Sequence, residues 1–198
     1  MDMLSILFPL VVLLGFVSFV VAVVYFRSEK EPEALQRRFL LRFYAYTMLF
    51  ISSLILLIGG GLLLKAALSY PLGIEFSYYG GPSISSERAR LRDLLNGVTF
   101  GAGALFFALH WALRNRVESP EERRLSFLNK GYLMMSGVVY GGLSLVLLPV
   151  GLYQLIEFYF FSWSRPVPGD IVGYALVALV LWLWILPQLF KSLGGERE

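Results

Sequence analysis

This 198-residue chain has few residues of the types that do chemistry: it contains one histidine, His110, and no cysteine. Imidazole titrates near neutral pH and ligates iron, so His110 could serve as a haem or quinone ligand or as a proton relay. A bis-histidine haem needs a second histidine, however, and a non-haem metal site needs several nitrogen or oxygen ligands. The missing cysteine excludes disulfides, thiolate metal sites and cysteine nucleophiles. His110 is therefore a weak candidate cofactor ligand, and we expect no metal site and no bound cofactor.

Four carboxylates lie beside apolar stretches: Glu75, Asp93, Glu157 and Asp170. A carboxylate inside a bilayer would suggest an ion or proton pathway. Asp93 and Asp170 precede apolar stretches, where they would complement the dipole at a helix N-terminus. Glu157 lies a few residues inside an apolar stretch, and with Lys65 it marks a candidate polar pathway. The sequence has no phosphate-cradling loop, zinc motif or Ser/His/Asp set in a plausible order, so we expect no catalytic residue and no enzyme activity.

The elements that carry these residues are predicted to be membrane helices. The chain is 57% hydrophobic and 16% charged, with a mean hydropathy of +0.68, and a soluble domain is less apolar and more charged. About twenty apolar residues at 1.5 Å rise cross the hydrocarbon core of a bilayer. Five stretches reach that length, so we predict an all-α polytopic fold with five transmembrane helices, at residues 4–26, 39–68, 94–113, 131–161 and 171–190.

Basic residues flank these predicted spans unequally. Twelve lysines and arginines fall on one side of the membrane and five on the other, at Lys65, Arg88, Arg90, Arg92 and Arg165. The positive-inside rule then places the N-terminus outside and the C-terminus in the cytoplasm. Because the positive charge is clustered beside spans and does not follow one face, it indicates topology and not a nucleic-acid partner.

Two predicted spans contain a GxxxG pattern, which permits close backbone approach between membrane helices. The third span has Gly97 and Gly101, and the fourth has Gly137 and Gly141. We expect these four glycines to lie at helix contacts.

The chain also shows a weak internal duplication. An offset of 86 residues pairs Arg37-Arg38 with Arg123-Arg124 and Tyr46 with Tyr132, and an offset of 77 pairs Asp93 with Asp170 and Arg114 with Lys191. This predicts an N-terminal anchor helix (1–30), a first hairpin with a long outer loop (31–116) and a second hairpin with a short cytoplasmic tail (117–198). The two hairpins have the same orientation, as in a parallel repeat.

A family resemblance accompanies the first hairpin. Its Arg37-Arg38 start, its Phe-Tyr-x-Tyr tract from Phe43 to Tyr46 and its close on His110-Trp111 resemble a bacterial family of membrane domains of unknown function. The resemblance covers residues 37–116 and more faintly 123–191, where Pro187-Gln188 replaces His-Trp. It implies the hairpin architecture and the bacterial cytoplasmic membrane, and it implies no chemistry.

Three functions remain open. The first is a non-catalytic accessory or scaffolding subunit whose glycine faces and outer loop contact lipid, other membrane subunits or a second copy. The second is a small transporter or channel with an outer vestibule around Lys65 and Glu157. The third is a redox subunit that binds a cofactor through His110.

Overall fold

The computed structural model describes residues 33–79, 82–161 and 166–194. Their regular structure is helical, and no strand occurs among them. The order is α2 (Glu33–Leu68), the short 3₁₀ helix η1 (Ile74–Phe76), α3 (Ile84–Val117), α4 (Pro120–Leu125), α5 (Phe127–Phe160) and α6 (Gly169–Gly194). The predicted anchor helix lies outside the described residues. Four of the described helices are long and apolar enough to cross a membrane.

The start of α3 lies two to three residues before the one that the sequence predicts, where the polar tract after Pro82 indicates a helix start with Ser85 or Ser86 as its N-cap. Ser83 is its N-cap, and the Ser83 and Ser86 side chains form a reciprocal capping box, which satisfies amides that would otherwise lack partners. The helix therefore begins at Ile84, about ten residues before the predicted span. The expectation that Asp93 complements the dipole of a helix N-terminus is wrong, because Asp93 lies two turns farther into α3. Asp170 does lie in the first turn of α6.

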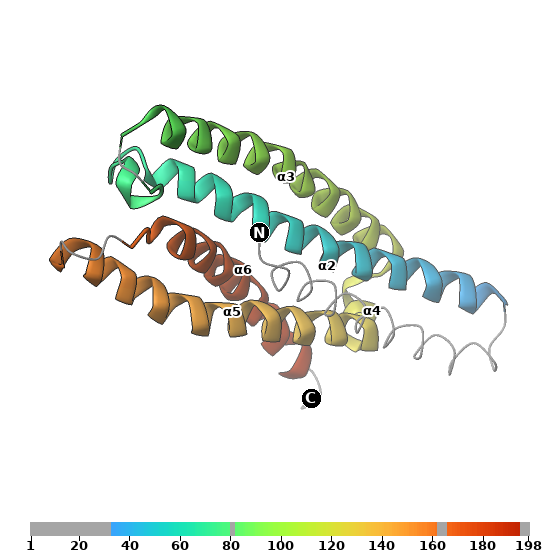
Figure 1. The fold of residues 1–198 in the computed structure, drawn as a ribbon. Coiled ribbons are helices and arrows are strands. Elements are labelled where there is room, and N and C mark those ends of the chain that lie inside the picture. The colour runs from blue at the N-terminus through green and yellow to red at the C-terminus, as the bar shows by residue number, and fades with distance from the viewer. Residues whose placement is uncertain (1–32, 80–81, 162–165, 195–198) are drawn as a thin grey trace. The chain divides into compact units, whose positions relative to one another are not determined.

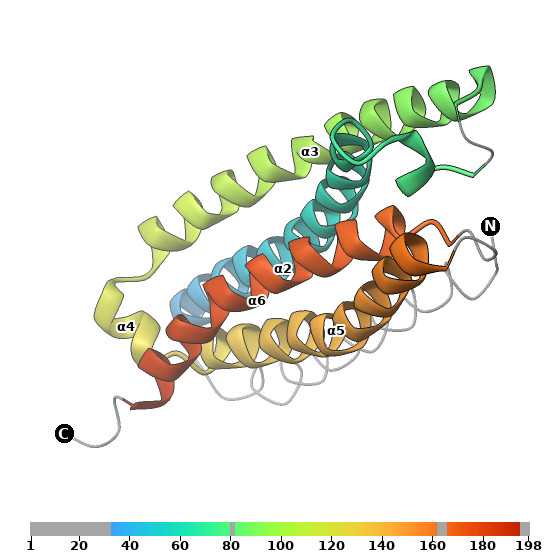
Figure 2. The same cartoon turned by 90° about the vertical axis from the view of Figure 1, so that its left-hand side faces the viewer.

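The connection between the two hairpins contains an unpredicted helix, α4. Ser119 caps it, Pro120 occupies its first turn, and the side chain of Glu122 bonds back to the Ser119 amide. Pro at the first helical position loses no intrahelical hydrogen bond. This six-residue helix joins α3 to α5 (Figure 2).

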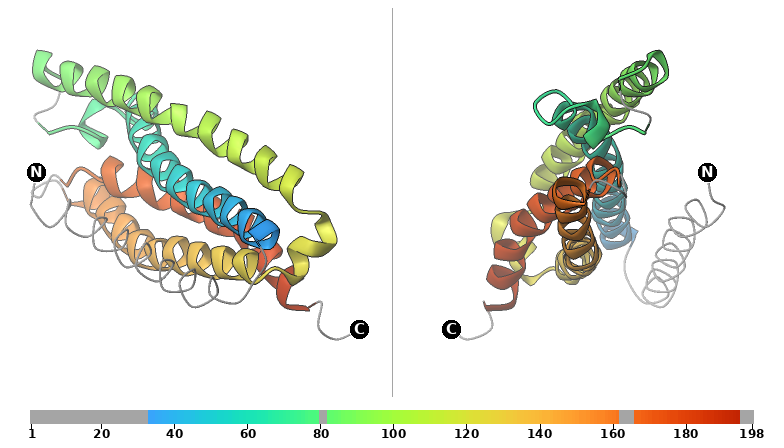
Figure 3. Two further views of the ribbon diagram at one scale, coloured as in Figure 1. Left: turned by 90° about the vertical axis from the view of Figure 1, so that its right-hand side faces the viewer. Right: turned by 60° about the vertical axis from the view of Figure 1, so that its left-hand side comes forward.

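The chain divides into two compact units, residues 1–41 and 42–198, and the packing described below lies within the second. In Figure 1, α3 runs beside α2 and α6 runs beside α5, and the further views in Figure 3 agree. The α2 helix also contacts the second hairpin. Its Tyr46 ring lies 5.6 Å from the ring of Tyr132 on α5, and its Gly60 faces Val177 on α6.

The apolar core forms where these helices meet. Leu49, Phe50, Leu133, Tyr140 and Ile185 are almost fully buried. The Ser53 and Tyr140 hydroxyls bond to each other within this core, so the Tyr140 phenol is not left unpaired in an apolar region.

The four glycines of the GxxxG patterns fall into two groups. A Cβ at Gly97 would lie 2.5 Å from Leu63 Cγ, and one at Gly141 would lie 2.7 Å from Trp182 Nε1, so these two lie at tight helix contacts. A Cβ at Gly137 would make only an ordinary contact, 3.7 Å from Leu189 Cδ2, and one at Gly101 would meet nothing within 4 Å. Gly101 nevertheless approaches α2 through its backbone, since a Cβ at Gly59 would lie 3.1 Å from the Gly101 amide nitrogen. The four glycines therefore differ in how tightly an added Cβ would pack, and the tight positions are Gly97 and Gly141.

Candidate functional sites at the two ends of the bundle

Lys65 is the centre of a charged cluster at the end of α2. Its Nζ lies 2.9 Å from Asp93 Oδ2 on α3 and 2.9 Å from Asp170 Oδ1 on α6. The lysine and Asp93 side chains are only 12% and 10% exposed, whereas Asp170 is 49% exposed. Lys65 also lies in the last turn of its helix, where a cation complements the helix dipole. One ammonium group thus joins three helices.

The loop after α2 closes over this cluster. Lys65 Nζ lies 4.7 Å from the centre of the Tyr78 ring, within the range of a cation–π interaction. The Ser77 hydroxyl donates a 2.8 Å hydrogen bond to the Lys65 carbonyl oxygen. Burial, followed by the negative charge of Asp93, raises the pKa of the Tyr78 phenol, so this phenol stays neutral at physiological pH.

Lys65 and Glu157, the two residues of the candidate polar pathway, lie in different surroundings. The charged partners of Lys65 are Asp93 and Asp170, which the sequence had assigned to helix ends. Glu157 lies in the last turn of α5, where its carbonyl oxygen accepts the Phe161 amide. The cluster can hold three helices together.

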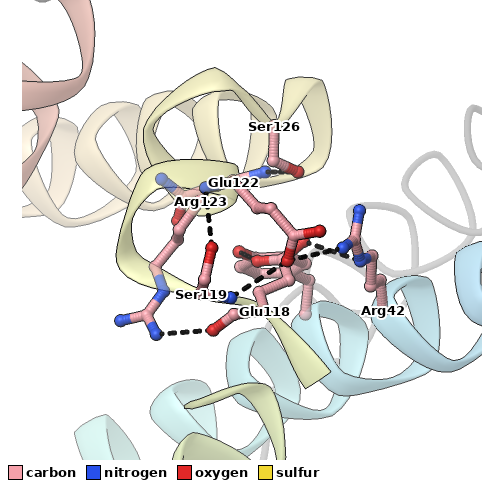
Figure 4. Close-up of polar contacts among 8 residues, drawn as sticks. Arg42, Glu118, Ser119, Glu122, Arg123 and Ser126 are labelled. Carbon is pink, nitrogen blue, oxygen red and sulfur yellow. Dashed lines mark hydrogen bonds and ion pairs between the residues drawn. The ribbon is translucent and has the colours of Figure 1, made fainter. Parts of the chain in front are cut away.

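A second charged cluster surrounds Glu118, at the C-cap of α3. The Glu118 side chain is fully buried, and Arg42 Nε lies 3.4 Å from its Oε1. The Tyr46 hydroxyl donates a 2.5 Å hydrogen bond to Oε2. Figure 4 shows Arg42 reaching from α2 toward Glu118 and Glu122, and its Nη2 lies 3.1 Å from Glu122 Oε2. A buried carboxylate is stable only when it is paired and hydrogen-bonded in this way.

The same cluster orders α4. Arg123 Nη2 donates a 3.2 Å hydrogen bond to the Glu118 carbonyl oxygen (Figure 4). Glu118 does not stand out in the sequence, because it lies in a short polar stretch with no periodicity. The available signal was the basic residue Arg42, placed in an apolar stretch with no acidic residue nearby in the sequence.

His110 is buried in the contact between α3 and α2. Its Nδ1 lies 2.7 Å from the Phe106 carbonyl oxygen and its Nε2 lies 3.2 Å from the Tyr44 hydroxyl. A carbonyl can only accept, so Nδ1 carries the proton, and in the neutral ring Nε2 accepts from Tyr44. Both ring nitrogens therefore have protein partners, and a haem iron would have to displace Tyr44. Among the described residues, no three histidine, aspartate or glutamate side chains form a group that could hold a metal ion.

Comparison with known proteins finds no matching family model, no similar curated protein and no similar solved structure. The resemblance of residues 37–116 to a bacterial family of membrane domains stays a prediction.

Proposed function

We propose that this protein is a non-catalytic subunit of a complex in the bacterial cytoplasmic membrane, and that it binds a transmembrane helix of a partner protein along the outer face of α3. The proposal combines the apolar helices, the closed charged clusters at their ends and the exposure of α3.

The observation that carries the proposal is a mismatch between polarity and burial. The 18-residue apolar window of α3 has a mean hydropathy of 1.3, against 2.3, 1.9 and 2.0 for the windows of α2, α5 and α6, so α3 contains the least apolar of the four candidate spans. It is also the least covered, with 17% of its membrane-spanning window buried against 39%, 28% and 28%. In a lipid bilayer the least apolar helix is expected to be the most buried, because polar groups are more stable against protein than against lipid. A partner helix against α3 would remove the mismatch.

The exposed face of α3 has the spacing of a helix-packing seam. Exposed apolar residues alternate at intervals of four and three along it, at Leu91, Leu95, Val98, Ala102, Leu105 and Leu109. This 3.5-residue period keeps one stripe in contact with a neighbouring helix that crosses at a shallow angle. Gly101 borders the stripe and leaves open space beside it, and small residues promote helix association in lipid. The expected occupant is therefore a helix.

The transporter alternative is less well supported. Two charged residues would line an outer vestibule, Lys65 and Glu157. Lys65 is already paired with two carboxylates at 2.9 Å each, and Glu157 lies in the last turn of α5. Between the two charged clusters, the contact of the hairpins contains the buried Ser53–Tyr140 pair and the packed rings of Phe107 and Trp184.

We also infer that the two hairpins are parallel repeats about an axis along the membrane normal. Residues that match at an offset of 77 lie close together: Asp93 and Asp170 share Lys65 as their partner, and the rings of Phe107 and Trp184 lie 5.6 Å apart. Tyr46 and Tyr132, which match at an offset of 86, also lie 5.6 Å apart. Equivalent residues contact each other only near a symmetry axis, so these pairs support the duplication.

Site-specific photo-crosslinking in native membranes tests the partner. A photoreactive residue replaces Val98 or Leu105, which are 66% and 69% exposed on the α3 stripe. We expect both positions to give an adduct with the same second protein. Leu145 on α5, 73% exposed, provides the control, and we expect it to give no such adduct.

Three results would contradict the partner proposal. An adduct at twice the mass of the chain would indicate self-association through α3. Adducts with lipid alone would mean that the face is bare. A cross-link from Val98 or Leu105 to the chain's own residues 4–26 would mean that the protein covers this face itself.

A further inference from the structure

A cavity of about 560 Å³ lies at the end of the bundle where α3 and α6 finish. Four basic residues line it, Arg114 from α3, Arg123 and Arg124 from α4, and Lys191 from α6, and its lining contains no carboxylate. The nearest acidic cluster, at Glu118 and Glu122, is paired with Arg42. The four basic residues outnumber these two carboxylates, which Arg42 already shares, so the cavity keeps a net positive charge.

Arg114 gives this cavity an unfilled hydrogen-bonding capacity. The residue is only 2% exposed, yet its Nε and Nη1 have no hydrogen-bond partner. Its Nη2 makes one long bond of 3.4 Å to Asn115 Oδ1. The guanidinium lies 3.6 Å from the centre of the Trp111 ring, which fixes its plane. A buried guanidinium with unpaired N–H groups costs free energy unless an acceptor binds it.

The composition of the walls indicates the kind of anion. Guanidinium groups match the geometry of phosphate oxygens and can bind them through two parallel hydrogen bonds. Trp111 and Leu133 add apolar wall beside the basic residues. A phosphate attached to an apolar chain would satisfy both kinds of wall at once, and basic pockets between membrane helices at the cytoplasmic side bind lipid head groups in this way.

We propose that this cavity binds a phosphate-bearing anion, with Arg114 as its buried ligand and Arg124 and Lys191 at its rim. The cavity lies at the end that the basic residues predict to be cytoplasmic. Arg114 and Lys191 match at the repeat offset of 77, as do Trp111 and Gln188, and all four line the cavity. The site is thus built from equivalent positions of the two hairpins.

Native mass spectrometry of the purified full-length protein, after delipidation in mild detergent, tests the proposal. Titration with phosphatidylglycerol and with phosphatidylcholine should show tighter binding of the anionic lipid. Arg124→Gln and Lys191→Gln remove exposed rim charges, so neither should disturb folding. Each should weaken phosphatidylglycerol binding roughly fivefold, the effect of about 1 kcal/mol per basic residue. Arg114→Gln should weaken it more.

Arg116→Gln is the matched control, because Arg116 is exposed near the same end of α3 and does not line the cavity. It should leave the affinity within twofold of the wild-type value. Competition with inorganic phosphate identifies the source of the anion. Displacement of phosphatidylglycerol at millimolar phosphate would support a free phosphate as ligand, and resistance to it would support a lipid head group.

Two results would overturn the proposal. One is a sign of a general surface effect, which would be either equal binding of the two lipids or a loss for Arg116→Gln as large as for the rim variants. The other concerns the carboxylates of Glu196 and Glu198, which follow the cavity-lining Gly194 in the sequence. We expect the double variant Glu196→Gln, Glu198→Gln to bind as the wild type does. Binding that occurs only in this variant would mean that the tail fills the cavity.

Discussion

Lys65 shows how one side chain can determine the arrangement of several helices. Its ammonium group pairs with two carboxylates that are 77 residues apart in the sequence and belong to different hairpins. At an offset of 86 the second hairpin has Gly151 where the first has Lys65, so a single lysine serves both aspartates. This asymmetry allows one lysine to pair with both aspartates at this end of the bundle.

Replacement of Lys65 by methionine tests this role. Asp93 would become a buried carboxylate without its cation, which costs about 3 kcal/mol of unfolding free energy. The half-exposed Asp170 would add little. Unfolding in mixed detergent micelles, followed by circular dichroism, measures the loss. The double variant Lys65→Met, Asp93→Asn should regain most of the stability, because it leaves no unpaired charge on α3.

The exposed Arg88 on α3 provides the control, and Arg88→Met should change the free energy of unfolding by less than about 0.5 kcal/mol. If Lys65→Met were as harmless as Arg88→Met, the cluster would not hold the helices. If the double variant were no more stable than Lys65→Met, the loss would come from the lysine stem and not from its charge.

At the scale of a single helix, α3 contains two glycines, Gly97 and Gly101, whose surroundings can be compared directly. Gly97 faces α2, where an added Cβ would lie 2.5 Å from Leu63 Cγ and 3.1 Å from the Gly59 carbonyl oxygen. Gly101, four residues later, has open space in the same direction. The sequence pattern treats the two as equivalent, but the contact surface of α3 does not include both Cβ positions.

We therefore expect Gly97→Ala to destabilise the bundle by about 1 to 3 kcal/mol through overpacking. Gly101→Ala should be neutral or slightly stabilising, because alanine is the better helix former. The same unfolding measurement compares them. Equal losses for both variants would mean that helix propensity or lipid contact, and not the α2–α3 contact, determines the effect. A stable Gly97→Ala protein would show that α2 and α3 do not pack as closely as the structure has them.

The elements themselves were largely predictable, because long apolar stretches indicate membrane helices without any tertiary information. The short helix α4 was missed, since its six residues are mostly charged and only the Ser119-Pro120 start and Glu122 signal it. Ion pairs between residues far apart in the sequence were harder to predict. Nothing local to Lys65 reveals that Asp170 is its partner, and only the offset of 77 suggested that Asp93 and Asp170 are related.

At the scale of the whole molecule, the two charged clusters distinguish the ends of the bundle. One contains Lys65, Asp93 and Asp170, and the other contains Arg42, Glu118 and Glu122. The basic cavity lies at the second end. Because parallel repeats place equivalent residues at the same membrane depth, the topology of one hairpin should fix that of the other.

The excess of basic residues beside the second end predicts that it faces the cytoplasm. The chain has no cysteine, so single cysteines can report the side directly. Tyr79 and Leu125 are suitable because they lie at opposite ends of the bundle and are 77% and 76% exposed, and neither caps a helix. In intact cells an impermeant maleimide should label Tyr79→Cys and not Leu125→Cys, whereas both should react after permeabilisation. Labelling of Leu125→Cys alone in intact cells would reverse the orientation and place the phosphate cavity outside. Labelling of both would mean that α3 does not cross the membrane.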